Sequence, residues 1–222
     1  MVDLQEIESL IKDQNYLVLD LNISIKNMLR LKSEKYEHES SIKKHGFFQH
    51  HWYQLKFISV IQLAKLFSQS SNEERSFKKL CLILDGPQYG SDFERLLKDN
   101  SLKSAEVAKS REDVLKITSN TRKKLKANKI LIKKVIDARN KIYAHLDPKP
   151  DVEYINSVEI QKLVEVATDL HNTFQFMIFS RTTEFSLSKD WDIDYVLWYM
   201  SELRRKDMEE LEGKKDILHK KS

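Results

Sequence analysis

The chain has few of the residues that break or cross-link a fold. Its 222 residues include only 4 glycines and 3 prolines, too few for the many turns of a large sheet. Charged residues make up 32% and hydrophobic residues 41%, a balance that suits long helices with one face in water. We therefore predict an all-α fold.

Cysteine and long apolar runs are also scarce. The single Cys81 excludes an intramolecular disulfide, and its place in the run LCLIL predicts a small core side chain rather than a nucleophile. No apolar run approaches the ~18 residues of a membrane span, and the acidic start MVDLQEIESL is unlike a signal peptide. We expect a soluble, cytoplasmic protein with no membrane partner. The net charge of +4 does not by itself demand a nucleic-acid partner.

Apolar residues at helical spacing predict a series of helices with short connections. The expected helices cover 3–35 (one helix, or two that divide near Asp13-Gln14-Asn15), 47–67, 71–85, 91–97, 103–127, 128–145, 156–180 and 192–212. The segment 36–46 is polar and predicts a connection, and 213–222 predicts a frayed basic tail. No repeat or boundary divides the chain, so we predict a single helical domain over 1–222.

Three details of these helices are explicit expectations. The helix expected over 71–85 begins at Ser71-Asn72-Glu73-Glu74, which offers a capping side chain and an acidic first turn, and it stops at Asp85-Gly86-Pro87. Aromatic residues recur at helical spacing and are expected in the core, with base stacking as an alternative. These aromatics are Trp52, Tyr53, Phe57, Trp191, Trp198 and Tyr199.

The segment RNKIYAH, from Arg139 to His145, brings two chemically capable side chains to a helix end. The stripe Leu131, Val135, Ala138 and Ile142 is expected to face the core, which leaves Arg139 at its border. On an ideal helix, Arg139 and His145 lie roughly 120° apart around the axis and about 9 Å apart along it. If the two residues act together, either the turn before Pro148 is distorted or a second copy of the chain faces it. The alternative is that both residues cap a helix end, where cations favour the carbonyl groups.

Two blocks of sequence together resemble a known family. The aromatic-rich block HHWYQLKFISVIQLAKLF precedes the segment RNKIYAHLD, and this order resembles the AbiU2-like branch of HEPN domains, a group of abortive-infection proteins. The resemblance implies a HEPN-type helical bundle, with a core over roughly 46–182 and additional flanking helices.

The resemblance also implies a function. It indicates a metal-independent endoribonuclease with a composite active site at a homodimer interface, acting as a toxin or phage-defence effector that an antitoxin protein restrains. Arg139 and His145 match the catalytic positions, and Asn140 matches the polar position beside the arginine. The chemistry agrees, because a histidine with a pKa of about 6.5 transfers protons near neutral pH. An arginine holds a phosphate through its guanidinium fork.

Basic residues gather just before this motif. Seven lie within 122–134, and Lys123, Lys126 and Lys129 are candidate contacts to an RNA backbone. Lys141 and Tyr143 are further RNA-binding candidates inside the motif. The alternatives are a solvated helix face for the lysines and packing for the tyrosine.

Other kinds of site lack support. The histidines His45, His50 and His51 have no partner at metal-ligand spacing, so no metal is expected. No P-loop, dinucleotide-binding glycine motif or pair of catalytic carboxylates occurs, so no cofactor is expected. Two rival hypotheses stay open. One is a catalytically inactive HEPN domain that acts as an RNA-binding or protein-interaction module, and the other is an unrelated helical scaffold.

Overall fold

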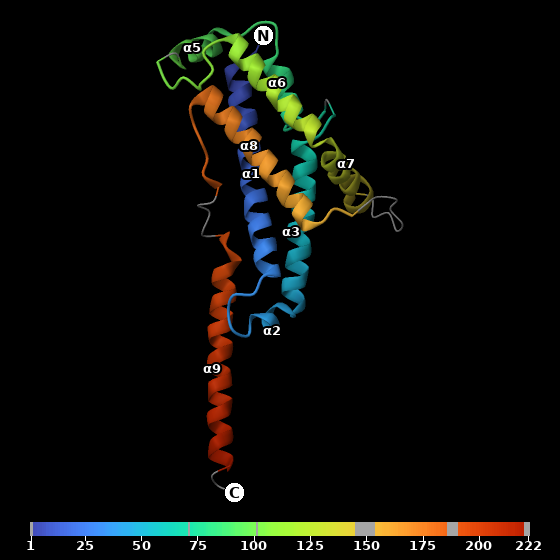
Figure 1. Cartoon of the computed structure of the whole chain (residues 1–222), viewed down its shortest axis with the longest axis vertical. Helices are drawn as coiled ribbons and strands as arrows, with labels where there is room; N and C mark the ends of the chain where they lie inside the picture. Colours follow the sequence, from blue (N-terminus) through green and yellow to red (C-terminus); the bar gives the residue numbers. More distant parts are fainter. Residues whose placement is uncertain (1, 71, 101, 145–153, 186–190, 220–222) are drawn as a thin grey trace.

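A computed structural model of the chain describes residues 2–70, 72–100, 102–144, 154–185 and 191–219, with the side chains of 142–144 and 214–219 outside the description (Figure 1). These residues form helices and no strand, so the all-α prediction is confirmed. The α-helices are α1 (Leu4–Lys32), α2 (Glu39–Lys43), α3 (Gly46–Leu66), α4 (Phe77–Leu84), α5 (Ser91–Asn100), α6 (Arg111–Ala127), α7 (Lys129–Ala138), α8 (Ser157–Phe179) and α9 (Ile193–His219). A π-helix, η1 (Arg139–Ala144), continues α7. No helix in the described ranges combines the length and the apolar character needed to cross a bilayer.

Helix α1 is the element on which the bundle is assembled, because it packs along both α3 and α8 (Figure 1). The Asp3 side chain caps it by accepting a hydrogen bond from the Gln5 N–H at 3.0 Å. Its buried face runs the length of the helix, from Ile7 to Leu31. The chain therefore has one helix here rather than two, and Gln14 in its middle is fully buried and donates to the Arg75 carbonyl at 3.0 Å.

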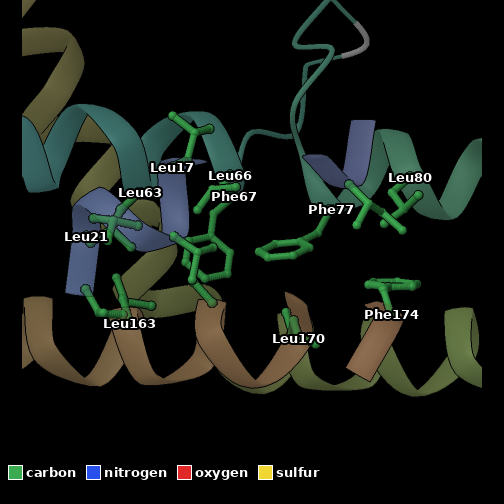
Figure 2. Close-up of a cluster of buried hydrophobic side chains, with 14 of the residues drawn as sticks. Leu17, Leu21, Leu63, Leu66, Phe67, Phe77, Leu80, Leu163, Leu170 and Phe174 are labelled. Atoms are coloured by element: carbon green, nitrogen blue, oxygen red, sulfur yellow. The ribbon is translucent and has the colours of Figure 1, made fainter. Parts of the chain in front are cut away.

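Side chains from α1, α3, α4 and α8 meet in one hydrophobic core (Figure 2). Three aromatic rings run through it in sequence: Phe67 and Phe77 have centroids 5.7 Å apart, and Phe77 and Phe174 have centroids 6.5 Å apart. All three rings are at most 1% exposed. The predicted central helix over 47–67 supplies one wall of this core as α3, within one residue at each end.

Two helix starts differ from the sequence prediction. Helix α4 begins at Phe77, where the Ser76 hydroxyl accepts from the Lys79 N–H at 3.1 Å, so the predicted start at Ser71–Glu74 is wrong. Helix α6 begins at Arg111 behind the cap Ser110, and residues 103–110 are not helical. Several residues compete for each cap in these polar stretches, and burial of the first apolar side chain selects among them.

Three other boundaries also move. The polar connection over 36–46 contains the short helix α2, and α5 extends past residue 97 to Asn100. Asn100 is fully buried, and its amide donates to the carbonyls of Ala108 at 3.1 Å and Ile178 at 2.9 Å, which fixes the end of α5. Helix α9 continues to His219, so the tail that was expected to fray over 213–222 is helical as far as that residue.

Helix α9 leaves the bundle, as Figure 1 shows. It carries exposed aromatic side chains. Among the side chains of this helix that the structure describes, the buried ones lie in its first turns and are Ile193, Leu197 and Ser201. Trp191, Trp198 and Tyr199 are 69%, 42% and 53% exposed, so the prediction that they lie in the core is wrong. On α3 the same prediction fails for Tyr53 and Phe57, and of the predicted set only Trp52 is half-buried. Helical spacing identifies the helix, but the fold decides which face another element covers.

A polar network attaches α9 to α1 and α2. Arg30 donates to both carboxylate oxygens of Glu39, at 2.5 and 2.9 Å, and to Asp194 at 2.5 Å. Tyr36 and Lys35 complete the contacts of Asp194, at 2.9 and 2.8 Å. Glu39 is fully buried, so its charge depends on these partners.

The same contacts shift the ionisation of both carboxylates. Burial alone would raise the pKa of Glu39, but hydrogen bonds from Arg30 and Lys43 and from the backbone N–H groups of Tyr36 and Lys35 together lower it to about 2. Burial likewise opposes the hydrogen bonds that lower the pKa of Asp194 to about 2. A carboxylate whose folded pKa is depressed stabilises the fold above its unfolded pKa, and this stabilisation is lost as the pH falls through the folded pKa.

Truncation of the aromatic row tests the core. Phe174→Ala is expected to lower the free energy of unfolding by about 3–5 kcal/mol, because it removes a buried ring and leaves a cavity. Urea unfolding measures this change. Leu102→Ala is the control, since Leu102 is 89% exposed, and it is expected to change stability by less than about 0.5 kcal/mol. Equal effects of the two substitutions would contradict the described core.

Removal of the buried carboxylate tests the network. Glu39→Gln is expected to lower stability at pH 7 by about 3–5 kcal/mol, because Arg30 then loses a buried charged partner. The wild type is expected to lose stability as the pH falls from about 4.5 to about 2, and the variant is expected to lose less over that range. Unfolding curves across this pH range measure both effects, with the exposed Glu34→Gln as control. An acid dependence that Glu39→Gln leaves unchanged would contradict the assignment.

Candidate functional site

The motif helix is built from a break between α6 and α7. The N–H of Asn128 bonds the carbonyls of Lys124 and Leu125, both at 3.2 Å, and this turn ends α6. Helix α7 then packs on α3 and buries Ile132, Val135 and Ala138. The expected core stripe is thus confirmed at Val135 and Ala138, and Arg139, directly after it, is half-buried as expected for a border position.

The last turn of the motif helix is not α-helical. Residues Arg139–Ala144 form the π-helix η1, in which each carbonyl bonds an N–H five residues ahead instead of four. Of the two arrangements that the sequence left open, a distorted last turn or a second copy facing it, the distorted turn is present as far as Ala144. Single π-turns within helices occur frequently at functional sites. His145 and the following Leu146-Asp147-Pro148 lie outside the described residues.

The side chains of Arg139 and Asn140 are half-buried and uncommitted. Neither forms an ion pair or a side-chain hydrogen bond with another residue that the structure describes. Such a guanidinium is available to an external anion. Lys141 is exposed, and Tyr143 belongs to η1 with its side chain outside the description.

Four of the seven basic residues before the motif are held by acids. Lys134, only 9% exposed, bonds Glu159 at 2.8 Å, and with the capping Asn156 this contact lowers the pKa of Glu159 although burial opposes it. The other pairs are Arg122–Asp85, Lys124–Asp169 at 2.6 Å and Lys133–Asp137 at 2.5 Å. The remaining three are the predicted candidates Lys123, Lys126 and Lys129, and none of them forms an ion pair within the described part of the chain.

A cavity of about 450 Å³ is lined by two of these three lysines. Lys126 and Lys129 line it, whereas Lys123 lies outside its lining. The cavity lies between α4, α6 and α7, and Gln69, Lys78 and Arg122 at its edge were not singled out from the sequence. Its full lining is Gln69, Lys78, Cys81, Arg122, Leu125, Lys126, Lys129, Ile132, Lys133 and Ile136.

Cys81 forms part of the cavity floor. The residue is 1% exposed, its sulfur lies 4.0 Å from the Thr118 carbonyl oxygen, and burial raises the pKa of its thiol to about 12. A thiol with so high a pKa is a poor nucleophile at neutral pH. This agrees with the prediction of a core side chain.

The histidines near the start of α3 have structural roles. The His45 ring caps α3 by accepting from the Phe47 N–H at 3.3 Å, and the His51 ring stacks on Phe47 with centroids 6.1 Å apart. Among the described residues, no three side chains of histidine, cysteine, aspartate or glutamate gather in a group that could hold a metal ion.

Comparison with protein families decides where this architecture belongs. The HEPN family model described as AbiU2 matches residues 4–192. The chain belongs to the AbiU2 family of HEPN proteins. Searches of curated proteins and of solved structures returned no match.

The AbiU2 match agrees with the architecture at both ends. It begins at Leu4, the first residue of α1, and ends at Asp192, directly before α9. The central helix α1 is thus part of the AbiU2 region, which begins well before the expected core boundary at residue 46. Helix α9 with its exposed aromatic residues is the flanking element. The prediction of a single domain over 1–222 stays a prediction.

The buried thiol gives a direct test of the cavity floor. Cys81 in the folded protein is expected to react with a chromogenic disulfide reagent at pH 8 at least about a hundredfold more slowly than in urea, because burial suppresses both thiolate formation and access. Absorbance of the released thiol measures the two rates. Equal rates would mean that the thiol is accessible and that the floor is open to solvent.

Proposed function

We propose that this AbiU2-family chain is a metal-independent endoribonuclease that acts as an abortive-infection or toxin-type effector. The observation that carries the proposal is the π-helical turn at Arg139–Ala144, inside the region that the AbiU2 model matches, in which Arg139 has no partner among the described residues. A helix end that served only as a cap would use its arginine on nearby carbonyl groups.

The proposed reaction uses the nucleophile that RNA itself carries. His145 removes the proton from a 2′-OH, and the oxygen attacks the adjacent phosphorus. The P–O5′ bond then breaks, and the leaving oxygen takes the proton from the His145 imidazolium to become a 5′-OH, which restores the neutral imidazole. The other product is a 2′,3′-cyclic phosphate. Arg139 stabilises the additional negative charge on the phosphate in the transition state.

Asn140 and a second copy of the chain complete the proposed site. Asn140 orients Arg139 or His145 through its amide and takes no part in proton transfer. In the proposed homodimer one copy supplies the arginine and the other supplies the histidine across a two-fold axis. RNA is the substrate, a homodimer is the active form, and an antitoxin protein is the partner that restrains it.

A catalytically inactive interaction module is the second candidate. The exposed apolar side chains on α9, Tyr195 and Trp198 among them, support it, because large exposed apolar surfaces mark contacts to other proteins. This candidate predicts RNA or protein binding without cleavage.

Cleavage in the presence of EDTA tests the proposal. The purified chain is expected to cut single-stranded RNA to 2′,3′-cyclic phosphate and 5′-OH ends, and Arg139→Ala and His145→Ala are each expected to lower the rate at least about a hundredfold. Gel electrophoresis of end-labelled RNA gives the rates, and mass spectrometry identifies the ends.

Lys162→Ala, an exposed substitution on α8, is the matched control and is expected to keep the wild-type rate. If His145→Ala cleaves RNA at the wild-type rate, the nuclease proposal is overturned. RNA binding without any cleavage would favour the inactive module.

A further inference from the structure

The cavity between α4, α6 and α7 has the size and chemistry of a ligand site. Its volume of about 450 Å³ lies within the ~300–1,000 Å³ typical of pockets that enclose small molecules. The floor is apolar, with Cys81 and Ile132 buried and with Leu125 and Ile136 half-buried. Such a floor receives a flat apolar group.

The rim of the cavity carries charge of one sign. Five lining residues are basic and none is acidic, and all lie in the described part of the chain. Asp85 holds Arg122, and Asp137 holds Lys133 at 2.5 Å. Lys78 donates to the Gln69 carbonyl at 2.5 Å. Lys126 and Lys129 are exposed and form no ion pair with a described residue, so these two ammonium groups are free to bind an anion.

An aliphatic acid would need only one of these cations, whereas a phosphodiester strand uses several. The rim also offers an amide. Gln69 donates from Nε2 to the Phe67 carbonyl at 3.2 Å, and its Oε1 remains available as an acceptor. An amide with donor and acceptor atoms matches the edge of a nucleobase. Apolar floor, cationic rim and edge amide together fit a nucleotide.

The position of the cavity relates it to the motif. Its lining residues on α7 recur at helical spacing, from Lys129 through Ile132 to Ile136. Ile136 lies three residues before Arg139, the first residue of η1, which is about 4.5 Å along the axis of an α-helix. A ligand in the cavity therefore lies about one turn from the motif, along the face of α7 that leads to it.

We propose that this cavity is a nucleotide-binding subsite. One unpaired base inserts against Leu125, Ile132 and Ile136, and the flanking phosphates contact Lys126 and Lys129. The inference rests on the proposed function for the source of the nucleotide, which is the RNA strand that continues toward Arg139.

Binding of an oligonucleotide that cannot be cut tests the subsite separately from cleavage. The probe is an eight-residue oligouridylate with 2′-O-methyl groups throughout, titrated calorimetrically into the full chain at several salt concentrations. A second arm titrates 5′-UMP and 5′-AMP, which distinguishes a strand from a free nucleotide.

Two variants separate the rim from the floor. The double variant Lys126→Gln/Lys129→Gln is expected to weaken oligonucleotide binding at least tenfold and to reduce the salt slope by about 1.4, at ~0.7 for each lost phosphate contact to a single strand. Leu125→Trp is expected to fill the cavity and to weaken binding at least tenfold with the salt slope unchanged.

Matched controls lie on the same helix outside the cavity lining. Lys116→Gln and Leu115→Trp are expected to change the affinity less than twofold, and thermal unfolding confirms that each variant is folded.

The outcomes are distinguishable from those of the cleavage assay. Loss of oligonucleotide binding in both cavity variants supports the subsite whether or not the wild type cuts RNA. If the same variants lose only mononucleotide binding, the site is a nucleotide site whose source is a free nucleotide. If folded Leu125→Trp binds all three probes as the wild type does, the proposal is overturned, even when the enzyme is active.

Discussion

The structure depends on the burial of α1 between α3 and α8. The buried face of this helix runs from Ile7 to Leu31, and the aromatic row of Phe67, Phe77 and Phe174 closes the core beside it. Because α3 is fixed against α1, it provides a rigid surface on which α7 packs. The position of Arg139 is thus set by hydrophobic packing that begins far from the motif in sequence. The span of the AbiU2 family match, which begins at the first residue of α1, fits this dependence.

The basic side chains around α6 and α7 differ in whether they have acidic partners. Most basic side chains around α6 and α7 are neutralised by acids, and Lys134 in particular secures α7 to the start of α8. Lys123, Lys126, Lys129 and Arg139 form no ion pair with a described residue, and of the three lysines Lys126 and Lys129 line the cavity. Positive charge that has no acidic partner beside an apolar cavity favours the binding of a phosphate ligand. This asymmetry links the proposed nuclease motif and the proposed nucleotide subsite.

Helices with a regular apolar period, such as α3 and α8, could be predicted from the sequence almost to the residue. The start of a helix could not be predicted where several capping residues compete. Ser71, Asn72 and Ser76 compete in this way before α4, and burial of Phe77 decides between them. The exposed aromatic residues of α9 show that periodicity does not reveal whether a partner covers a face. In the site, helix geometry left two alternatives for Arg139 and His145, a distorted turn or a second copy of the chain. The cavity could not be predicted from the sequence, because it joins residues from Gln69 to Ile136 that only the tertiary fold brings together.

The most direct test of the central claim, that RNA runs along α6, α7 and η1, is photochemical cross-linking followed by peptide mapping. An uncleavable RNA that carries 4-thiouridine is irradiated on the full chain, and the modified peptides are identified by mass spectrometry. The account predicts cross-links within residues 122–144, with the strongest at the cavity lining. Cross-links confined to α9 or α5, with none in residues 122–144, would contradict it.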